Sequence, residues 1–146
     1  MTVIRVQAED FDPGEELARL EALDIGAVAS FTGLVRGDNG LIALTLEHYP
    51  AMTENALRAI ADEAHRRWPL AGITIIHRHG RLLPGEHIVF VATASSHRGA
   101  ALEACAFLID WLKTDAPFWK REEQADGSAH WIEAREADLE AKSRWT

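Results

Sequence analysis

Two lysines seven positions apart, Lys113 and Lys120, are the residues best suited to proton transfer. Lysine supplies only three of the 15 basic residues, and arginine supplies the others. An amine can lose its proton and act as a base or nucleophile, whereas a guanidinium cannot. Each position also has an ordinary structural interpretation, because Lys113 would stabilise a helix end and Lys120 fits a solvent-facing strand. Apolar neighbours favour the chemical interpretation by desolvating an amine: Trp111, Pro117, Phe118 and Trp119.

The segment Ser96-His97-Arg98-Gly99 predicts an anion site at the start of a helix. A helix N-terminus presents free N–H groups and a partial positive charge, to which His97 and Arg98 add an imidazole and a guanidinium. Cations at this end oppose the helix dipole, so their placement indicates either binding or ordinary first-turn residues. The combination suits a phosphate. Arg36, next to the turn segment Gly37–Gly40, is by itself typical of a solvated arginine.

Two other groups of residues are weaker candidates. His77 and His79 share one face of a predicted strand, a spacing compatible with metal binding, but the sequence places no third ligand beside them. The single cysteine, Cys105, lies among apolar helix residues and is typical of a small buried hydrophobe. We therefore predict no metal site.

Chain length and net charge limit the classes of protein to which this sequence can belong. The chain has 146 residues, which predicts one domain spanning residues 1–146, and its net charge of −8 argues against nucleic-acid and anionic-membrane binding. A protein of this charge needs a local basic pocket to hold an anion. The N-terminal segment has no targeting pattern, and no apolar stretch is long enough to span a bilayer. These features predict a cytoplasmic protein.

Hydrophobic periodicity predicts three helices among short strands. The order is β, α, ββ, α, ββ, α, ββ, which favours an α+β domain with a mainly antiparallel sheet. The strands around Gly37–Gly40 are expected to form a hairpin, and residues from Glu136 to Trp145 are expected to be a polar, peripheral tail. The predicted helices cover about 13–23, 51–67 and 97–113, and the predicted strands 3–7, 27–36, 42–48, 73–79, 87–94, 118–123 and 129–134.

Six stretches, in order along nearly the whole chain, resemble the large, catalytic subunit of molybdopterin synthase. They are FTGLVR (31–36), LTLEHYPAMTE (44–54), HRHGRLLPGE (77–86), SSHRGAALEA (95–104), LKTDAPFWKRE (112–122) and HWIEAREAD (130–138). The resemblance implies an α+β fold of the hammerhead type. The turn segment Gly37–Gly40 is shorter than is common in the family.

The resemblance also implies a sulfur transferase of molybdenum cofactor biosynthesis. Its substrate would be cyclic pyranopterin monophosphate (precursor Z). The sulfur would come from a small ubiquitin-like partner subunit whose C-terminal Gly-Gly carries a thiocarboxylate. Two large subunits would form a homodimer with one small subunit at each end, a heterotetramer. No redox step is implied, so we expect no cofactor.

The same resemblance assigns roles to individual residues. Lys113 would lie beside the inserted partner tail, and both lysines would be catalytic. The residues expected to bind substrate are Leu34, Val35, Arg36, His97, Arg98, Lys113, Lys120, Arg121 and Glu122.

Helix geometry conflicts with a site inside one chain. A single helix would separate Arg98 from Lys113 by more than 20 Å, at about 1.5 Å per residue. We therefore expect a composite site in which Lys113 and Lys120 of one subunit face His97 and Arg98 of the other. Two alternatives remain open: a non-catalytic module that binds a Gly-Gly tail or a small phosphate, and a metal-dependent hydrolase that uses His77 and His79.

Overall fold

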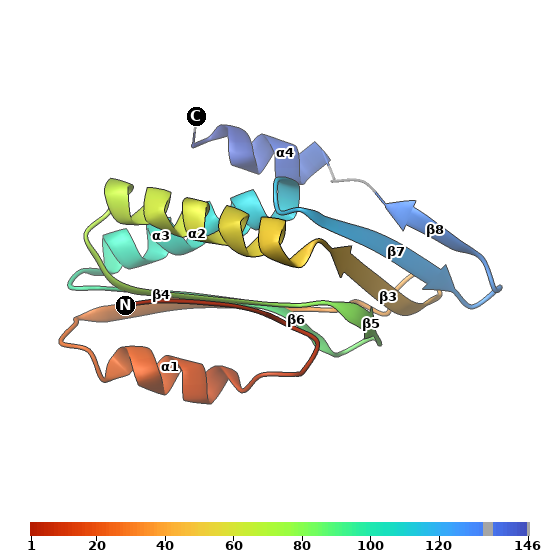
Figure 1. Cartoon of the computed structure of the whole chain (residues 1–146), viewed down its shortest axis with the longest axis horizontal. Coiled ribbons are helices and arrows are strands. Elements are labelled where there is room, and N and C mark those ends of the chain that lie inside the picture. Colours follow the sequence, from red (N-terminus) through yellow and green to blue (C-terminus); the bar gives the residue numbers. More distant parts are fainter. Residues whose placement is uncertain (133–135, 146) are drawn as a thin grey trace.

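Two four-stranded sheets and four helices make up the residues that the computed structural model describes, 1–132 and 136–145 (Figure 1). The α+β class is confirmed, but three helices and one mainly antiparallel sheet were predicted. The elements are β1 (Thr2–Gln7), α1 (Pro13–Glu21), β2 (Ala27–Leu34), β3 (Leu41–His48), α2 (Pro50–Arg67), β4 (Leu70–Arg78), β5 (Gly80–Leu82), β6 (His87–Ser95), α3 (Arg98–Thr114), β7 (Phe118–Gln124), β8 (Ala129–Ile132) and α4 (Glu136–Ser143).

The first sheet has the order β1-β4-β6-β2 and is covered on both faces, by α1 on one side and by α2 and α3 on the other (Figure 1). Alternate residues of the central strands enter two different cores. Ile75 and Val91 pack toward α2 and α3, whereas Ile76 and Phe90 pack toward α1. Burial on both faces explains the nearly continuous apolar run of β4. The sheet is mixed because β1 pairs with β4 in parallel.

The second sheet, β5-β3-β7-β8, is antiparallel and extends beyond one end of the first (Figure 1). The predicted hairpin around Gly37–Gly40 is wrong, because β2 pairs with β6 in one sheet and β3 pairs with β5 and β7 in the other. Backbone hydrogen bonds from Val35 to Glu86 and from Gly85 to Val35 hold the chain where it leaves the first sheet. Arg36 therefore lies at the junction of the two sheets.

Two further pairs of strands that are consecutive in the predicted order, 73–79 with 87–94 and 118–123 with 129–134, are paired in the structure. β4 pairs with β6, and β7 pairs with β8, both antiparallel. The last predicted strand, 129–134, is present as Ala129–Ile132, and its residues 133 and 134 lie outside the described residues. In the described part of the chain, no helix combines the length and apolar character that crossing a membrane requires.

The helix α4 corrects the prediction of a peripheral tail. Trp145, which follows it, packs edge-on against Phe107 of α3 and against Trp68. Its indole Nε1–H donates a hydrogen bond of 2.7 Å to the Asp110 carboxylate. Lys142 of α4 forms an ion pair with Asp115 at the end of α3. These contacts hold the C-terminal segment against α3.

Candidate active site

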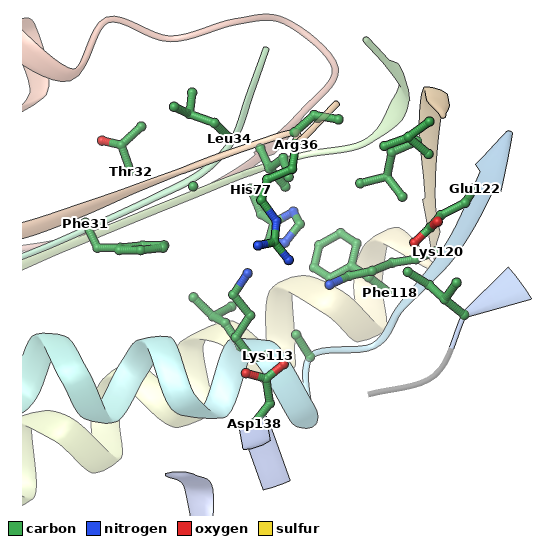
Figure 2. A pocket seen from close by; sticks show the side chains of 18 of the residues that line it. Phe31, Thr32, Leu34, Arg36, His77, Lys113, Phe118, Lys120, Glu122 and Asp138 are labelled. Carbon is green, nitrogen blue, oxygen red and sulfur yellow. The ribbon is translucent and has the colours of Figure 1, made fainter. Parts of the chain in front are cut away.

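A cavity of about 640 Å³ opens where the two sheets meet the C-terminal end of α3. Its walls come from β2, the segment after it, β4, α3, β7 and α4, so segments distant in sequence form one site (Figure 2). The residues labelled in this view are Phe31, Thr32, Leu34, Arg36, His77, Lys113, Phe118, Lys120, Glu122 and Asp138.

Both predicted lysines line this cavity. Lys113 lies in the last turn of α3, where a cation interacts favourably with the helix dipole. Lys120 lies on β7 and pairs in register with Leu46 of β3. The side chains of Lys113 and Lys120 point into the same space from different walls (Figure 2). The structure thus brings together two amines that the sequence places on a helix and on a strand.

Strand alternation decides which neighbours of Lys120 share the cavity. Phe118 and Glu122 line it with Lys120, as period-two geometry requires. Arg121 was also predicted to bind substrate, but it does not line the cavity, because alternate residues of a strand point to opposite faces. Trp119, on the same face as Arg121, is 45% exposed, and Trp111 lines a separate small cavity. Of the four predicted apolar neighbours, Phe118 alone is among the residues lining this cavity.

The predicted segment Leu34, Val35 and Arg36 also lines the cavity. The buried side chain of Val35 anchors this segment in the core, whereas the side chain of Leu34 is half exposed to solvent. Arg36 extends its guanidinium toward the centre of the site (Figure 2). By its local sequence this arginine was typical of a solvated residue, whereas the resemblance predicted substrate binding, and the junction of the two sheets places it in the cavity.

His97 and Arg98 lie at the opposite end of α3 and do not line the cavity. The helix runs from Arg98 to Thr114, so Arg98 and Lys113 are about 22 Å apart along its axis. His97 is the residue before the first turn, and its side chain makes no capping hydrogen bond. The structure confirms the separation that the sequence predicted, and one chain does not unite these residues with the lysines.

The cavity gathers three basic side chains in one space although the chain as a whole carries −8. Arg36, Lys113 and Lys120 line it together with the carboxylates of Asp38, Glu122 and Asp138, and the three cationic groups come from three different walls. Three cations in a partly enclosed space attract an anion more strongly than the same charges on an open surface, because solvent screens them less. The arrangement therefore suits an anionic ligand.

His77 and Asp138 are among the lining residues that the sequence did not predict as parts of this site. His77 was considered only as a metal ligand, and Asp138 lies in the predicted tail. For His77, the signal in the sequence was its position near the end of an apolar strand. Burying a polar side chain there costs free energy unless a hydrogen bond compensates for the lost water. For Asp138 no local signal exists, because its position depends on the docking of α4.

The metal alternative receives no support from the described residues. Within 1–132 and 136–145, no group of three or more His, Cys, Asp or Glu side chains is arranged to hold a metal ion. The ring of His79 lies tilted against that of His48, with centroids 4.5 Å apart, and His79 does not line the cavity. Burial raises the pKa of the Cys105 thiol to about 12, so the thiol stays protonated and is not a nucleophile.

Comparison with known proteins identifies the family. The model described as "MoaE protein" matches residues 6–115. The chain belongs to this family. A "Molybdopterin synthase catalytic subunit" from Mesorhizobium japonicum is 54% identical, and the match covers 97% of this chain and 92% of the relative. One from Escherichia coli K12 is 53% identical, over 99% and 98%. The solved "Molybdopterin biosynthesis MoaE protein" from Burkholderia ambifaria has a TM-score of 0.85 and 52% identity, covering 99% and 98%.

Proposed function

We propose that this chain is the catalytic subunit of a molybdopterin synthase, a sulfur transferase of molybdenum cofactor biosynthesis. The observation that carries the proposal is the cavity in which Arg36, Lys113 and Lys120 converge inside an acidic protein. Relatives more than 50% identical over nearly the whole chain bear this name. The proposal includes one domain, residues 1–146, with a fold of the hammerhead type.

The proposed substrates are both anions. One is cyclic pyranopterin monophosphate, and the other is the C-terminal thiocarboxylate of a small ubiquitin-like partner subunit. Their mutual repulsion must be offset before a sulfur–carbon bond can form, and lysine and arginine side chains supply that stabilisation through charge-assisted hydrogen bonds. Arg36, Lys113 and Lys120 are placed for this role.

The reaction also needs proton transfer. The thiocarboxylate sulfur bonds to a carbon of the pterin side chain while a carbon–oxygen bond at that carbon breaks, and the oxygen leaves as water or as a phosphate oxygen. Water then cleaves the bond between the partner's carbonyl carbon and that sulfur. The sulfur stays on the pterin, and the partner leaves as a carboxylate. Two such transfers, each from a new thiocarboxylate, supply the two sulfurs of the product. These steps require a proton donor and acceptor near the reacting atoms, which Lys113 and Lys120 can supply as amines.

The proposed enzyme is a homodimer with one partner subunit at each end, and its site includes His97 and Arg98 of the second copy. Within one chain the length of α3 keeps these residues from the cavity. A two-fold axis repeats every contact, so a dimer that brings one such helix start to the cavity of its partner makes two complete sites. The phosphate would then lie between the helix N-terminus and the lysines.

A direct assay tests the proposed function. The purified chain is mixed with the small partner carrying a thiocarboxylate and with the pyranopterin, and molybdopterin is measured. We expect product formation that depends on the thiocarboxylate and is lost in Lys113→Ala. A chain that binds the partner's Gly-Gly tail and yields no molybdopterin would instead be the non-catalytic binding module.

A further inference from the structure

His77 is a buried polar residue of the cavity to which the proposed reaction assigns no task. It lies near the C-terminal end of β4, pairs in register with Val89 of β6 and is 5% exposed. It lines the cavity, and Arg36 and Lys113 extend toward it (Figure 2). A buried side chain that borders a ligand-sized space is placed to contact what binds there.

Two contacts fix the orientation of the His77 ring. The ring stacks on Phe118 of β7, with centroids 3.8 Å apart and planes at 15°. Its Nδ1 is 2.9 Å from the carbonyl oxygen of Arg78. A carbonyl can only accept, so Nδ1 carries the hydrogen and donates it. The stack and the hydrogen bond together leave Nε2 as the second polar atom of the ring.

The ring is neutral, and its Nε2 holds a lone pair. Burial lowers the pKa of His77 to about 3; the hydrogen bond to Arg78 opposes this shift, and the charges of Lys120 and Lys113 and the nearby His48 add to it. In the neutral ring with hydrogen on Nδ1, Nε2 is an acceptor. None of the hydrogen bonds found among residues 1–132 and 136–145 uses Nε2.

A buried neutral ring nitrogen differs chemically from the charged groups of this cavity. Arg36, Lys113 and Lys120 are donors only, and the carboxylates of Asp38, Glu122 and Asp138 carry a negative charge that attracts those cations. The neutral polar side chains of Thr32, Asn39 and Thr114 also line the cavity, but His77 is the one held by an aromatic stack. An imidazole nitrogen accepts a hydrogen bond without adding negative charge, so it does not weaken the attraction of the cavity for an anion. It therefore suits a neutral N–H or O–H group.

We propose that Nε2 of His77 accepts a hydrogen bond from an N–H or O–H group of the substrate and thereby selects a ligand that joins such a donor to an anionic group. The inference rests on the proposed function, since a pyranopterin carries ring N–H groups together with a phosphate. His77 is then a substrate-binding residue that hydrogen-bonds to the heterocycle, while the cations bind the phosphate and the thiocarboxylate.

Three variants test this role in the complex with the thiocarboxylated partner. His77→Phe keeps an aromatic ring against Phe118 and removes the acceptor, whereas His77→Gln offers an amide oxygen in its place. The matched control is His65→Phe on α2, whose ring bonds to Thr2 and does not line the cavity. We expect His77→Phe to raise the KM for the pterin about 2- to 12-fold with a smaller change in kcat, the effect of one net hydrogen bond. His77→Gln should recover most of the loss, and His65→Phe should match the wild type.

A measurement on the unmodified protein does not depend on the folding of a variant. Nitrogen-15 NMR of labelled histidines should show His77 with hydrogen on Nδ1 and none on Nε2, and adding the pyranopterin should move the Nε2 resonance toward its hydrogen-bonded position. An Nε2 signal that the pterin leaves unchanged would overturn the inference. So would a His77→Phe enzyme with the KM of the wild type. Both results differ from failure of the proposed function, in which the wild-type complex makes no molybdopterin.

Discussion

Lysine and arginine carry the same charge, but only lysine gives up its proton readily, so one substitution separates two roles for Lys113. If the amine transfers a proton, Lys113→Arg should keep the partner's affinity and lower kcat by about 100-fold or more, the usual contribution of general acid–base catalysis. Single-turnover formation of molybdopterin measures the effect. A Lys113→Arg enzyme close to wild-type activity would reduce this lysine to an electrostatic anchor.

The burial of His77 makes stability depend on pH. Its pKa is about 3 in the folded chain against 6.5 for an ordinary imidazole, so between these values the unfolded state binds more protons. Stability must therefore fall as the pH falls through this window. Relative to His77→Gln, the wild type should lose about 2 kcal/mol of unfolding free energy between about pH 7 and pH 5. Denaturant titrations at both pH values measure the difference, and parallel losses in the two proteins would contradict a neutral, buried His77.

The sequence predicted part of the site at the level of single residues. Lys113 and Lys120 were predicted from their residue type, and Arg36 was predicted from the family resemblance. The structure brings all three together in one cavity. Arg121 does not line this cavity, because the alternation of the strand sets the direction of its side chain, which the motif does not show. His77 was considered only as a weak candidate for a metal ligand, because its stack on Phe118 joins two strands of different sheets. Contacts between sheets leave no local pattern in a sequence.

At the scale of elements, local signals predicted the existence of strands better than their partners. Asn39 and Gly40 have positive φ, as the turn chemistry of this segment predicts. The turn nevertheless joins two sheets, because β2 finds its partner in β6, far along the chain. The helix α4 was missed for a similar reason. Its docking depends on Trp145 reaching Phe107 and Asp110, and its own residues are mostly polar.

The docking of α4 can be tested through Trp145. Trp145→Ala removes the edge-on contacts with Trp68 and Phe107 and the hydrogen bond to Asp110. We expect a loss of about 1–3 kcal/mol in unfolding free energy, since the side chain is only partly buried. Trp131→Ala is the matched control, because this tryptophan is 55% exposed on β8. Equal small effects of both substitutions in denaturant titrations would show that Trp145 does not hold the C-terminal segment.

At the scale of the whole molecule, the proposed site requires two copies of the chain. Light scattering at micromolar concentration, without the partner subunit, should give the mass of a homodimer. Arg98→Ala should leave this mass and the partner's affinity unchanged while weakening pyranopterin binding by about 1.5–3 kcal/mol, the scale of a hydrogen bond to a charged group. A monomeric chain would contradict the composite site. Equal loss of pterin and partner binding would indicate damage to the fold.

Mixing two impaired variants tests the central claim most directly, that cavity and helix start come from different subunits. Lys113→Ala should be inactive alone, and Arg98→Ala should have little activity alone when the pyranopterin concentration is kept well below the Kd of that variant. In an equal mixture with free subunit exchange, half of the dimers contain one of each, and each of these has one intact site, so activity should approach one quarter of the wild type. A mixture shown to contain heterodimers that forms no molybdopterin would contradict the account.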